Sequence, residues 1–329
     1  MKKLFALMLA VIMVLSMASC QTETAGDSDG TMNVFVIIKG LGNAYWAILQ
    51  QGAMDAGEDL GVNVIIQGIP NEVDIEVQIG LLQNAVSARA DAIVIAVADS
   101  RAQANAVSDA FKSGIPIVKV DTRAETDDYH VAIMTDNVLA GEMAAEVLIG
   151  KMKNLVADDE VADIAVQIGS TGSQTIRQRM EGFEAYWAEH APAAWNLLTN
   201  DVKVNDGDIS RAVQFGHDFM TAYPNLKGFF SPNNGSTVGF ATALVEANRT
   251  DITMVGFDFS REMEEIIRDE RFNVATMLQQ QYMMGYDGVR FAVDLANGVA
   301  APVKDIDIGV MSVDFNNVDS EEVKAAAGL

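Results

Sequence analysis

IIKGLGNAYW, residues 37–46, joins an apolar run to the start of a helical pattern. The run that contains its first residues, Asn33–Lys39, is rich in β-branched residues and is typical of a buried strand. Gly40 and Gly42 mark a turn, and the apolar spacing of residues 44–60 predicts an amphipathic helix. Strand, glycine turn and helix in this order form the first unit of a parallel α/β sheet.

The same alternation continues along the chain. Strands are expected at Asn33–Lys39, Val62–Gln67, Ala92–Ala96, Ile117–Asp121, His130–Thr135, Ala162–Ile168, Leu198–Val204, Gly228–Ser231, Thr253–Asp258 and Asn273–Leu278. Helices are expected near 44–60, 74–89, 101–113, 138–153, 174–190, 209–222, 236–248, 260–269 and 282–297. The pattern runs twice with a break near 135–137, so we predict an α/β fold with two doubly wound parallel-sheet, Rossmann-like domains.

The start of the chain has the features of an export signal. Lys2 and Lys3 form a positive region, and the apolar stretch from Leu4 to Leu15 is short for a membrane span. A signal peptide over residues 1–19 is therefore predicted, and the protein is expected to leave the cytoplasm.

Cys20 is the single cysteine, so no disulfide can form within the chain. It follows Met17-Ala18-Ser19, which resembles a bacterial lipoprotein cleavage box. Lipidation of Cys20, a flexible tether over 20–30 and anchoring at the cell envelope are expected. The alternative is an ordinary cleaved signal beside an incidental cysteine.

The charge balance excludes several partners. The chain has 22 basic and 46 acidic residues, a net charge of −24. This argues against nucleic acid or an anionic bilayer surface as a partner. A monomer that meets the membrane only through its lipid anchor is expected.

Polar and aromatic residues gather just after the predicted strands. These are Lys39, Asn43, Tyr45, Trp46, Pro70, Asn71, Glu72, Asp121, Arg123, Asn233, Asn234, Asp258 and Gln279. In open α/β sheets the ligand crevice lies beyond the carboxyl ends of the strands. Any one Asp or Asn there could also be a helix cap or turn former.

The sequence gives little support for a catalytic or cofactor site. Tyr45 stands where a dinucleotide loop needs its third glycine, and no phosphate-binding loop motif occurs. The three histidines, His130, His190 and His217, are scattered, and no nucleophile with a base is legible. We therefore predict no metal, no cofactor and no enzymatic activity, with a nucleotide-dependent enzyme as the distant alternative.

The residues that do gather suit a sugar. An aromatic ring such as Tyr45 or Trp46 can cover the apolar face of a sugar ring, unless both simply pack in the core. Carboxylates accept hydrogen bonds from hydroxyls, arginine donates in a fixed fork, and amides do both.

A family resemblance covers nearly the whole body of the chain. It rests on GNAYWAILQQGAMDAGEDLGV (42–62), ADAIVIAVADSRAQANAV (90–107), GIPIVKVDTRA (114–124), TDNVLAGEMAAEVL (135–148), STGSQTIRQRMEGF (170–183), MVGFD (254–258) and VATMLQQQ (274–281). The sequence resembles periplasmic sugar-binding proteins of ABC importers, of the ribose-binding-protein type. The resemblance implies a type I periplasmic binding fold with a three-stranded hinge near 135–137, 279–281 and 309–312.

The resemblance also implies lobes and partners. One lobe would hold 31–135 plus 280–309 and the other 136–279 plus 310–329. Hinge closure would trap a small neutral sugar or polyol and present it to the permease subunits of an importer. An extracytoplasmic sensor role, or a nucleoside or furanone ligand, stays open.

Individual positions take roles from the same resemblance. The implied ligand contacts are Lys39, Asn43, Tyr45, Trp46, Glu72, Asp121, Arg123, Arg177, Asn233, Asp258 and Gln279. Arg179 is the alternative to Arg177, and an exposed salt bridge is the alternative for Lys39 and Glu72. Gly207 departs from the pattern, because many relatives carry an aromatic residue there.

Overall fold

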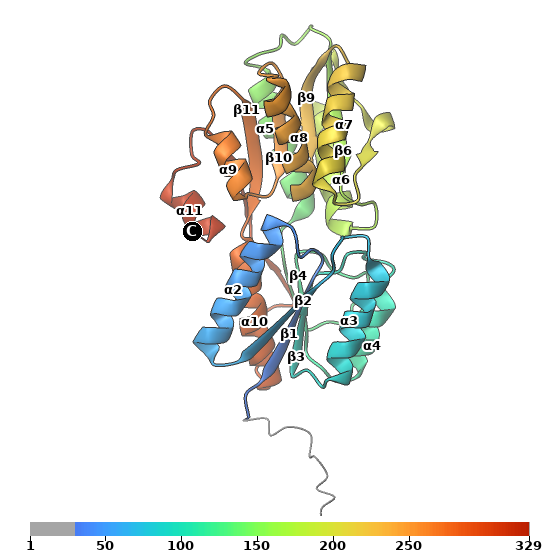
Figure 1. The fold of residues 1–329 in the computed structure, drawn as a ribbon, viewed down its shortest axis with the longest axis vertical. Helices are drawn as coiled ribbons and strands as arrows, with labels where there is room; N and C mark the ends of the chain where they lie inside the picture. Colours follow the sequence, from blue (N-terminus) through green and yellow to red (C-terminus); the bar gives the residue numbers. More distant parts are fainter. Residues whose placement is uncertain (1–29, 329) are drawn as a thin grey trace, which may run out of the picture. The chain divides into compact units, whose positions relative to one another are not determined.

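The computed structural model of the protein describes residues 30–328. The predicted signal peptide, Cys20 and most of the tether lie outside the described residues. The body contains two sheets, with helices packed on both faces of each (Figure 1). The two doubly wound α/β domains that the sequence predicts are confirmed.

The first sheet has the strand order β12-β5-β4-β3-β1-β2, and all its pairings are parallel. Its strands are β1 (Asn33–Ile38), β2 (Asn63–Gly68), β3 (Ala92–Ile95), β4 (Ile117–Val120), β5 (Val131–Met134) and β12 (Asp305–Asp307). Its helices are α2 (Ala44–Leu60), α3 (Ile75–Ser87), α4 (Ala104–Lys112) and α10 (Gln281–Ala296). We call this sheet with its helices the first lobe.

The second sheet has the order β13-β11-β10-β9-β6-β7, and β8 also pairs with β6. Its strands are β6 (Ala162–Ile168), β7 (Trp195–Leu197), β8 (Lys203–Val204), β9 (Leu226–Ser231), β10 (Thr253–Phe257), β11 (Asn273–Gln279) and β13 (Val310–Asp314). Its helices are α5 (Asn137–Met152), α6 (Gln174–His190), α7 (Ile209–Ala222), α8 (Asn234–Ala247), α9 (Arg261–Ile267) and α11 (Glu321–Ala327). This sheet with its helices is the second lobe.

The chain passes between the lobes three times, after β5, after β11 and after β12. These passages lie where the three hinge segments are expected. Gln280 Nε2 donates to the carbonyl of Ile308 at 2.6 Å, which ties two of the passages together. The three-stranded hinge of the predicted fold class is therefore present.

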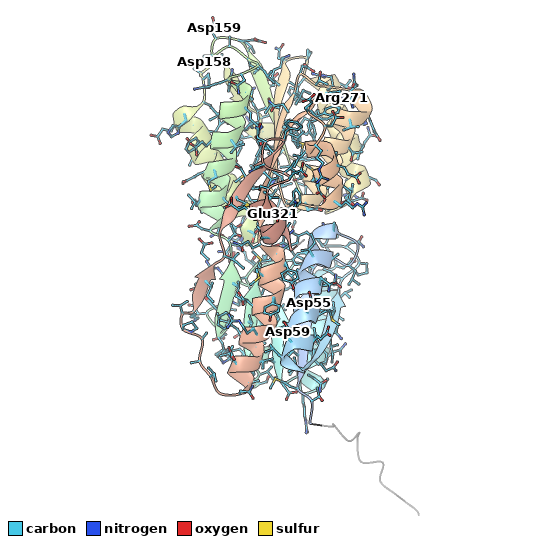
Figure 2. The ribbon with its side chains drawn as sticks, turned by 90° about the vertical axis from the view of Figure 1, so that its left-hand side faces the viewer. Asp55, Asp59, Asp158, Asp159, Arg271 and Glu321 are labelled. Atoms are coloured by element: carbon cyan, nitrogen blue, oxygen red, sulfur yellow. The ribbon has the colours of Figure 1, made fainter. Side chains whose placement is uncertain are left out.

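Close helix packing fixes the first lobe. A Cβ at Gly52 would lie 2.0 Å from the carbonyl oxygen of Tyr282, so only glycine lets α2 lie this close to α10. Asp55 and Asp59 lie on α2 beside α10 (Figure 2), and Asp55 accepts a hydrogen bond from the Tyr282 hydroxyl at 2.8 Å. This packing holds the first turn of α2, which carries the paired aromatic residues, against the sheet.

One predicted strand is wrong. The segment Leu198–Val204 contains a 3-10 turn, η1 (Thr199–Asp201), so only Lys203 and Val204 form a strand. The Asp201 carboxylate accepts from the Tyr223 hydroxyl and pairs with Lys203, and these bonds favour a turn over an extended strand. The sequence prediction also contained no counterpart to β7, β12, β13 or α11.

Candidate functional site

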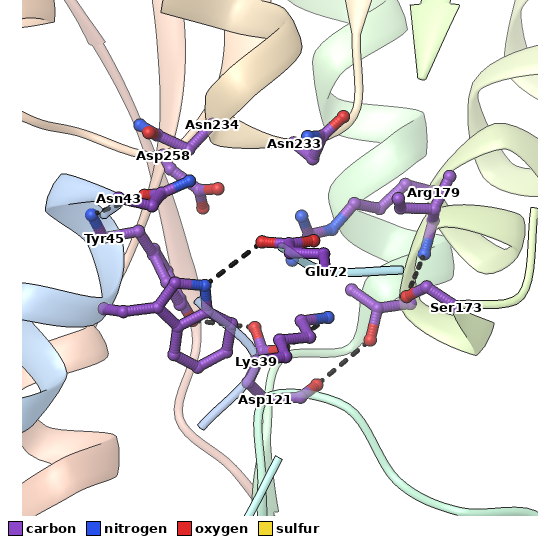
Figure 3. Close-up of a pocket in the computed structure, with 13 residues that line it drawn as sticks. Lys39, Asn43, Tyr45, Glu72, Asp121, Ser173, Arg179, Asn233, Asn234 and Asp258 are labelled. Carbon is purple, nitrogen blue, oxygen red and sulfur yellow. Dashed lines mark hydrogen bonds and ion pairs between the residues drawn. The ribbon is translucent and has the colours of Figure 1, made fainter. Parts of the chain in front are cut away.

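A narrow cavity lies between the two lobes, at the carboxyl ends of the strands, with about 20 Å³ open to the centre of a water molecule. It is lined by Lys39, Asn43, Tyr45, Trp46, Glu72 and Asp121 from the first lobe, and by Ser173, Thr175, Ile176, Arg179, Asn233, Asn234 and Asp258 from the second. Figure 3 shows these side chains converging from both lobes.

The glycine turn after β1 makes room for an aromatic side chain. A Cβ at Gly40 would lie 2.7 Å from Cδ1 of Trp46, so the indole fills the space beside the turn. Asn43 caps α2, because its side-chain oxygen accepts from the backbone N–H of Tyr45 at 2.9 Å. The rings of Tyr45 and Trp46 meet edge to face, with centroids 4.9 Å apart. The turn thus positions two aromatic rings, where a phosphate-binding loop would leave space for a phosphate group.

A buried ion pair forms the base of the site. Lys39 Nζ lies 3.2 Å from the Asp121 carboxylate and donates to the Thr122 hydroxyl at 2.7 Å. The Tyr45 hydroxyl donates to the other Asp121 oxygen at 2.8 Å. Although burial opposes ionisation, the charges of Lys39 and Arg179 lower the pKa of Asp121. Lys39 is therefore no exposed salt bridge, and among the described residues its ionic partner is Asp121.

The two aspartates that follow β4 and β10 share an unusual backbone. Asp121 has φ 57° and Asp258 has φ 74°, in the left-handed region that side chains other than glycine rarely adopt. Strained backbone of this kind costs on the order of 1 kcal/mol and often occurs at functional sites. In both lobes, the strain aims a carboxylate into the cavity.

Asp258 is held from behind by the hinge. Gln279 Nε2 donates to Asp258 Oδ1 at 2.6 Å, and the Thr135 hydroxyl donates to the side-chain oxygen Oε1 of Gln279 at 3.0 Å. Burial raises the pKa of Asp258 to about 6. Gln279 does not line the cavity, so it orients the carboxylate that does.

Arg179 reaches the cavity from α6 and is almost completely buried. Its Nε donates to the Asn137 side chain at 2.9 Å, and Nη1 donates to the carbonyl of Pro232 at 2.8 Å. Its Nη2 atom and the Nδ2 atom of Asn234 are buried and have no hydrogen-bond partner among the described residues. A buried donor without a partner is costly, so these two groups need an acceptor in the cavity.

Glu72 reaches across the cavity from the loop after β2. Its carboxylate accepts from Trp46 Nε1 at 3.2 Å, and burial raises its pKa. A Cβ at Gly207, in the second lobe, would lie 3.5 Å from Cγ of Glu72. Where the resemblance expects an aromatic residue, the glycine therefore leaves room for the side chain of Glu72.

Eight of the sequence-predicted contacts line this cavity, and three do not. Gln279 lies behind Asp258. Arg123 pairs with Asp305 at 3.3 Å and lines a separate pocket with Asn137 and Gln178 of the second lobe. Arg177 pairs with Glu125 at 2.6 Å and is a third exposed. In this structure, neither Arg123 nor Arg177 lines the cavity.

Five lining residues were not among the predicted contacts. They are Ser173, Thr175, Ile176, Arg179 and Asn234. Helical spacing could have found Arg179, since residues three or four apart share one face and Ile176, Arg179 and Phe183 are all buried. Arg177 lies off that face.

Two further types of site can be tested directly. Within residues 30–328, no cluster of three or more histidine, cysteine or acidic side chains is arranged to hold a metal ion. Over the same residues, no helix combines the length and apolarity needed to cross a membrane.

Comparisons with known proteins give relatives along nearly the whole chain. The ribose import binding protein RbsB of Salmonella typhimurium is 28% identical over 92% of this chain and 96% of its own. A carbohydrate transporter solute-binding protein of Agrobacterium radiobacter, solved with D-arabinose, has a TM-score of 0.85 at 28% identity, covering 91% of this chain and 100% of its own.

A third relative, an ABC transporter solute-binding protein of Agrobacterium vitis with bound D-fucose, has a TM-score of 0.81 at 28% identity, over 89% of this chain and 98% of its own. The family model described as a periplasmic binding protein domain matches residues 34–300. The resemblance read from the sequence is confirmed, and the chain belongs to the periplasmic binding protein domain family.

Proposed function

We propose that this protein is the solute-binding component of an ABC importer and binds a neutral monosaccharide or sugar-like polyol between its lobes. The observation that supports this best is the pair of buried donors without partners, Arg179 Nη2 and Asn234 Nδ2. They share the cavity with the Asp121 and Asp258 carboxylates and the indole of Trp46. Hydroxyl groups supply both acceptors and donors, so a polyol satisfies all of these groups at once.

The relatives support the same ligand class. The Salmonella protein is named for ribose import, and the two Agrobacterium structures hold D-arabinose and D-fucose. All three ligands are small neutral sugars. Because the protein would act by binding and release, no chemical step is required.

The remaining proposals from the sequence concern export, membrane anchoring, lobe boundaries and delivery of the ligand. We propose export by the signal over residues 1–19, a lipid on Cys20 and a tether to the body. We also propose the lobe boundaries from the sequence, which are 31–135 plus 280–309 for one lobe and 136–279 plus 310–329 for the other. With these boundaries the chain crosses between the lobes at each hinge segment. Delivery to a permease would follow closure around the ligand.

A thermal-shift screen of the purified protein tests the ligand class. D-ribose, D-arabinose, D-fucose, polyols and nucleosides are compared, because a ligand stabilises the state it binds. A shift with one sugar or polyol supports the proposal, and a shift with nucleosides alone contradicts it. Asp121→Asn should abolish the shift, while Asp305→Asn, which removes a carboxylate outside the cavity, should keep it.

A further inference from the structure

A group of contacts joins the lobes outside the cavity. Arg177 Nη2 of α6 lies 2.6 Å from Glu125 Oε1 in the loop after β4. The backbone N–H of Ser100 donates to the carbonyl of Gly172 at 3.2 Å, and the N–H of Gln174 donates to the Ser100 hydroxyl at 3.0 Å. We call Asp99, Ser100, Glu125, Gly172, Gln174 and Arg177 the latch.

Gly172 permits the closest approach in the latch. A Cβ at this position would lie 2.2 Å from Oδ2 of Asp99 and 2.8 Å from its Cγ. Asp99 cannot easily give way, because its Oδ1 accepts from the N–H groups of Arg101 and Ala102 at 2.9 Å. Any side chain at 172 would therefore act as a wedge between the lobes.

The first-lobe side of the latch is fixed by buried polar groups. Gln103 accepts from the backbone N–H of Asp99 at 2.9 Å and donates to Gln78 at 2.8 Å, and both amides are fully buried. Lys119, also fully buried, donates to the carbonyls of Ala124 and Thr126 on either side of Glu125. The latch thus rests on a preformed surface, which lowers the entropy lost when it closes.

Glu125, which forms the ion pair of the latch, has a second cationic partner. Glu125 is also 3.1 Å from Nε of Arg101, which belongs to its own lobe. When the lobes separate, Glu125 loses Arg177 but keeps Arg101, so no carboxylate is left without a partner. Opening therefore costs the contact with Arg177 without creating an unpaired carboxylate, so the latch slows release but does not prevent it.

We propose that the latch sets how long a bound ligand stays in the cavity, although none of the latch residues lines the cavity. This rests on the proposed function. Contacts made only in the closed state slow dissociation and leave association nearly unchanged. Glu125, Gly172 and Arg177 are therefore positioning residues that determine affinity from outside the site.

Stopped-flow tryptophan fluorescence tests the proposal, with Trp46 in the cavity as the reporter and the best sugar among D-ribose, D-arabinose and D-fucose as the probe. Glu125→Gln should raise the dissociation rate by about 2- to 5-fold at low salt, as for a partly exposed ion pair. Gly172→Ala should raise it by about 10-fold or more, as expected for a steric clash. Association should change less than about 2-fold.

Matched controls separate the latch from general effects. Gly150→Ala, where a Cβ meets nothing within 4 Å, and Asp251→Asn, in an exposed ion pair of the second lobe, should leave both rates unchanged. In a double-mutant cycle, Arg177→Gln should add little to Glu125→Gln. Full additivity would mean that Arg177 acts without Glu125, and unchanged dissociation in Gly172→Ala would equally overturn the proposal.

A measurement without sugar separates failure of the latch from failure of the proposed function. Hydrogen exchange at the N–H groups of Ser100 and Gln174 reports latch closure directly, because each donates to an acceptor in the opposite lobe. Exchange should be faster in Gly172→Ala than in the parent protein. If sugars bind but neither exchange nor dissociation changes, the latch is wrong and the sugar site stands.

Discussion

Two carboxylates in the cavity have opposite electrostatic surroundings. Asp121 has the ammonium of Lys39 at 3.2 Å, and this charge keeps it ionised despite burial. Asp258 forms no ion pair among the described residues, and the charge of Arg179 and the amide of Gln279 only partly offset its burial. Its ionised form is therefore costly until a ligand donates to it.

This difference predicts a pH dependence. Burial raises the pKa of Asp258 from 3.8 to about 6, so between these values the folded protein binds protons that the unfolded chain releases. This contribution makes stability fall as pH rises from about 4 to 6, by up to about 3 kcal/mol. Asp258→Asn should thus be more stable than the parent at pH 7 and equal to it near pH 4. Urea unfolding at both pH values measures this, and an equal difference at each would contradict it.

The two candidate arginines of the sequence can be separated by substitution. Arg179→Lys keeps the charge but loses the planar fork that meets Asn137 and Pro232, so sugar affinity should fall by about 10-fold or more. Arg123→Gln, outside the cavity, should bind as the parent does. Titration calorimetry with the best sugar compares them, and the reverse order would refute the position of the site.

At the scale of elements, helix contacts through glycine set how the lobes are built. Gly52 and Gly285 bring α2 and α10 together, and a Cβ on either would lie 2.0 Å from a carbonyl oxygen of the opposite helix. Gly141 and Gly182 do the same for α5 and α6. The helices that carry Trp46 and Arg179 both depend on such contacts for their distance from the neighbouring helix.

Substitution of one such glycine should therefore affect stability and binding together. Gly52→Ala should lower the free energy of unfolding by at least about 1–3 kcal/mol, because backbone must move to admit the methyl group. Gly80→Ala on α3, where a Cβ meets nothing within 4 Å, should be neutral or slightly stabilising. Paired denaturant titrations would reveal this contrast, and equal stability of the two variants would disprove it.

The sequence predicted most elements because their ends carry readable signals. The expected helices 44–60, 174–190 and 209–222 match α2, α6 and α7, each capped by Asn43, Ser173 or Asp208. The lining residues of the first lobe lie within eight residues of a strand end, so their position follows from the strand pattern. Which residues of α6 line the cavity depends on the face of the helix that they occupy, and the identity of a single residue does not reveal that face. Short β12 and β13 are formed by tertiary pairing and leave little local pattern.

At the scale of the whole molecule, the cavity belongs to neither lobe alone. Thr175 of the second lobe donates to the carbonyl of Asp121 in the first at 3.0 Å and meets the hydroxyl of Thr122 at the same distance. The structure is therefore a closed arrangement, in which both halves of the site are assembled. Closure and binding must be thermodynamically linked, since only this arrangement offers every contact.

That linkage predicts compaction on binding. Saturating sugar should reduce the radius of gyration in small-angle scattering and raise stability by about 2.7 kcal/mol at a concentration 100 times Kd. Asp258→Asn should show neither change with the sugar. If the parent protein binds sugar without becoming more compact, hinge closure is not part of its cycle.

The three passages between the lobes also dictate an order of assembly during synthesis. A growing polypeptide that has reached Gln280 still lacks α10, which covers α2, β3 and β4, and lacks β12 at the edge of the first sheet. It also lacks β13, the antiparallel neighbour of β11. Completion of both lobes therefore requires residues 281–328. A translocation machine that accepts only unfolded substrates gains time from this delay.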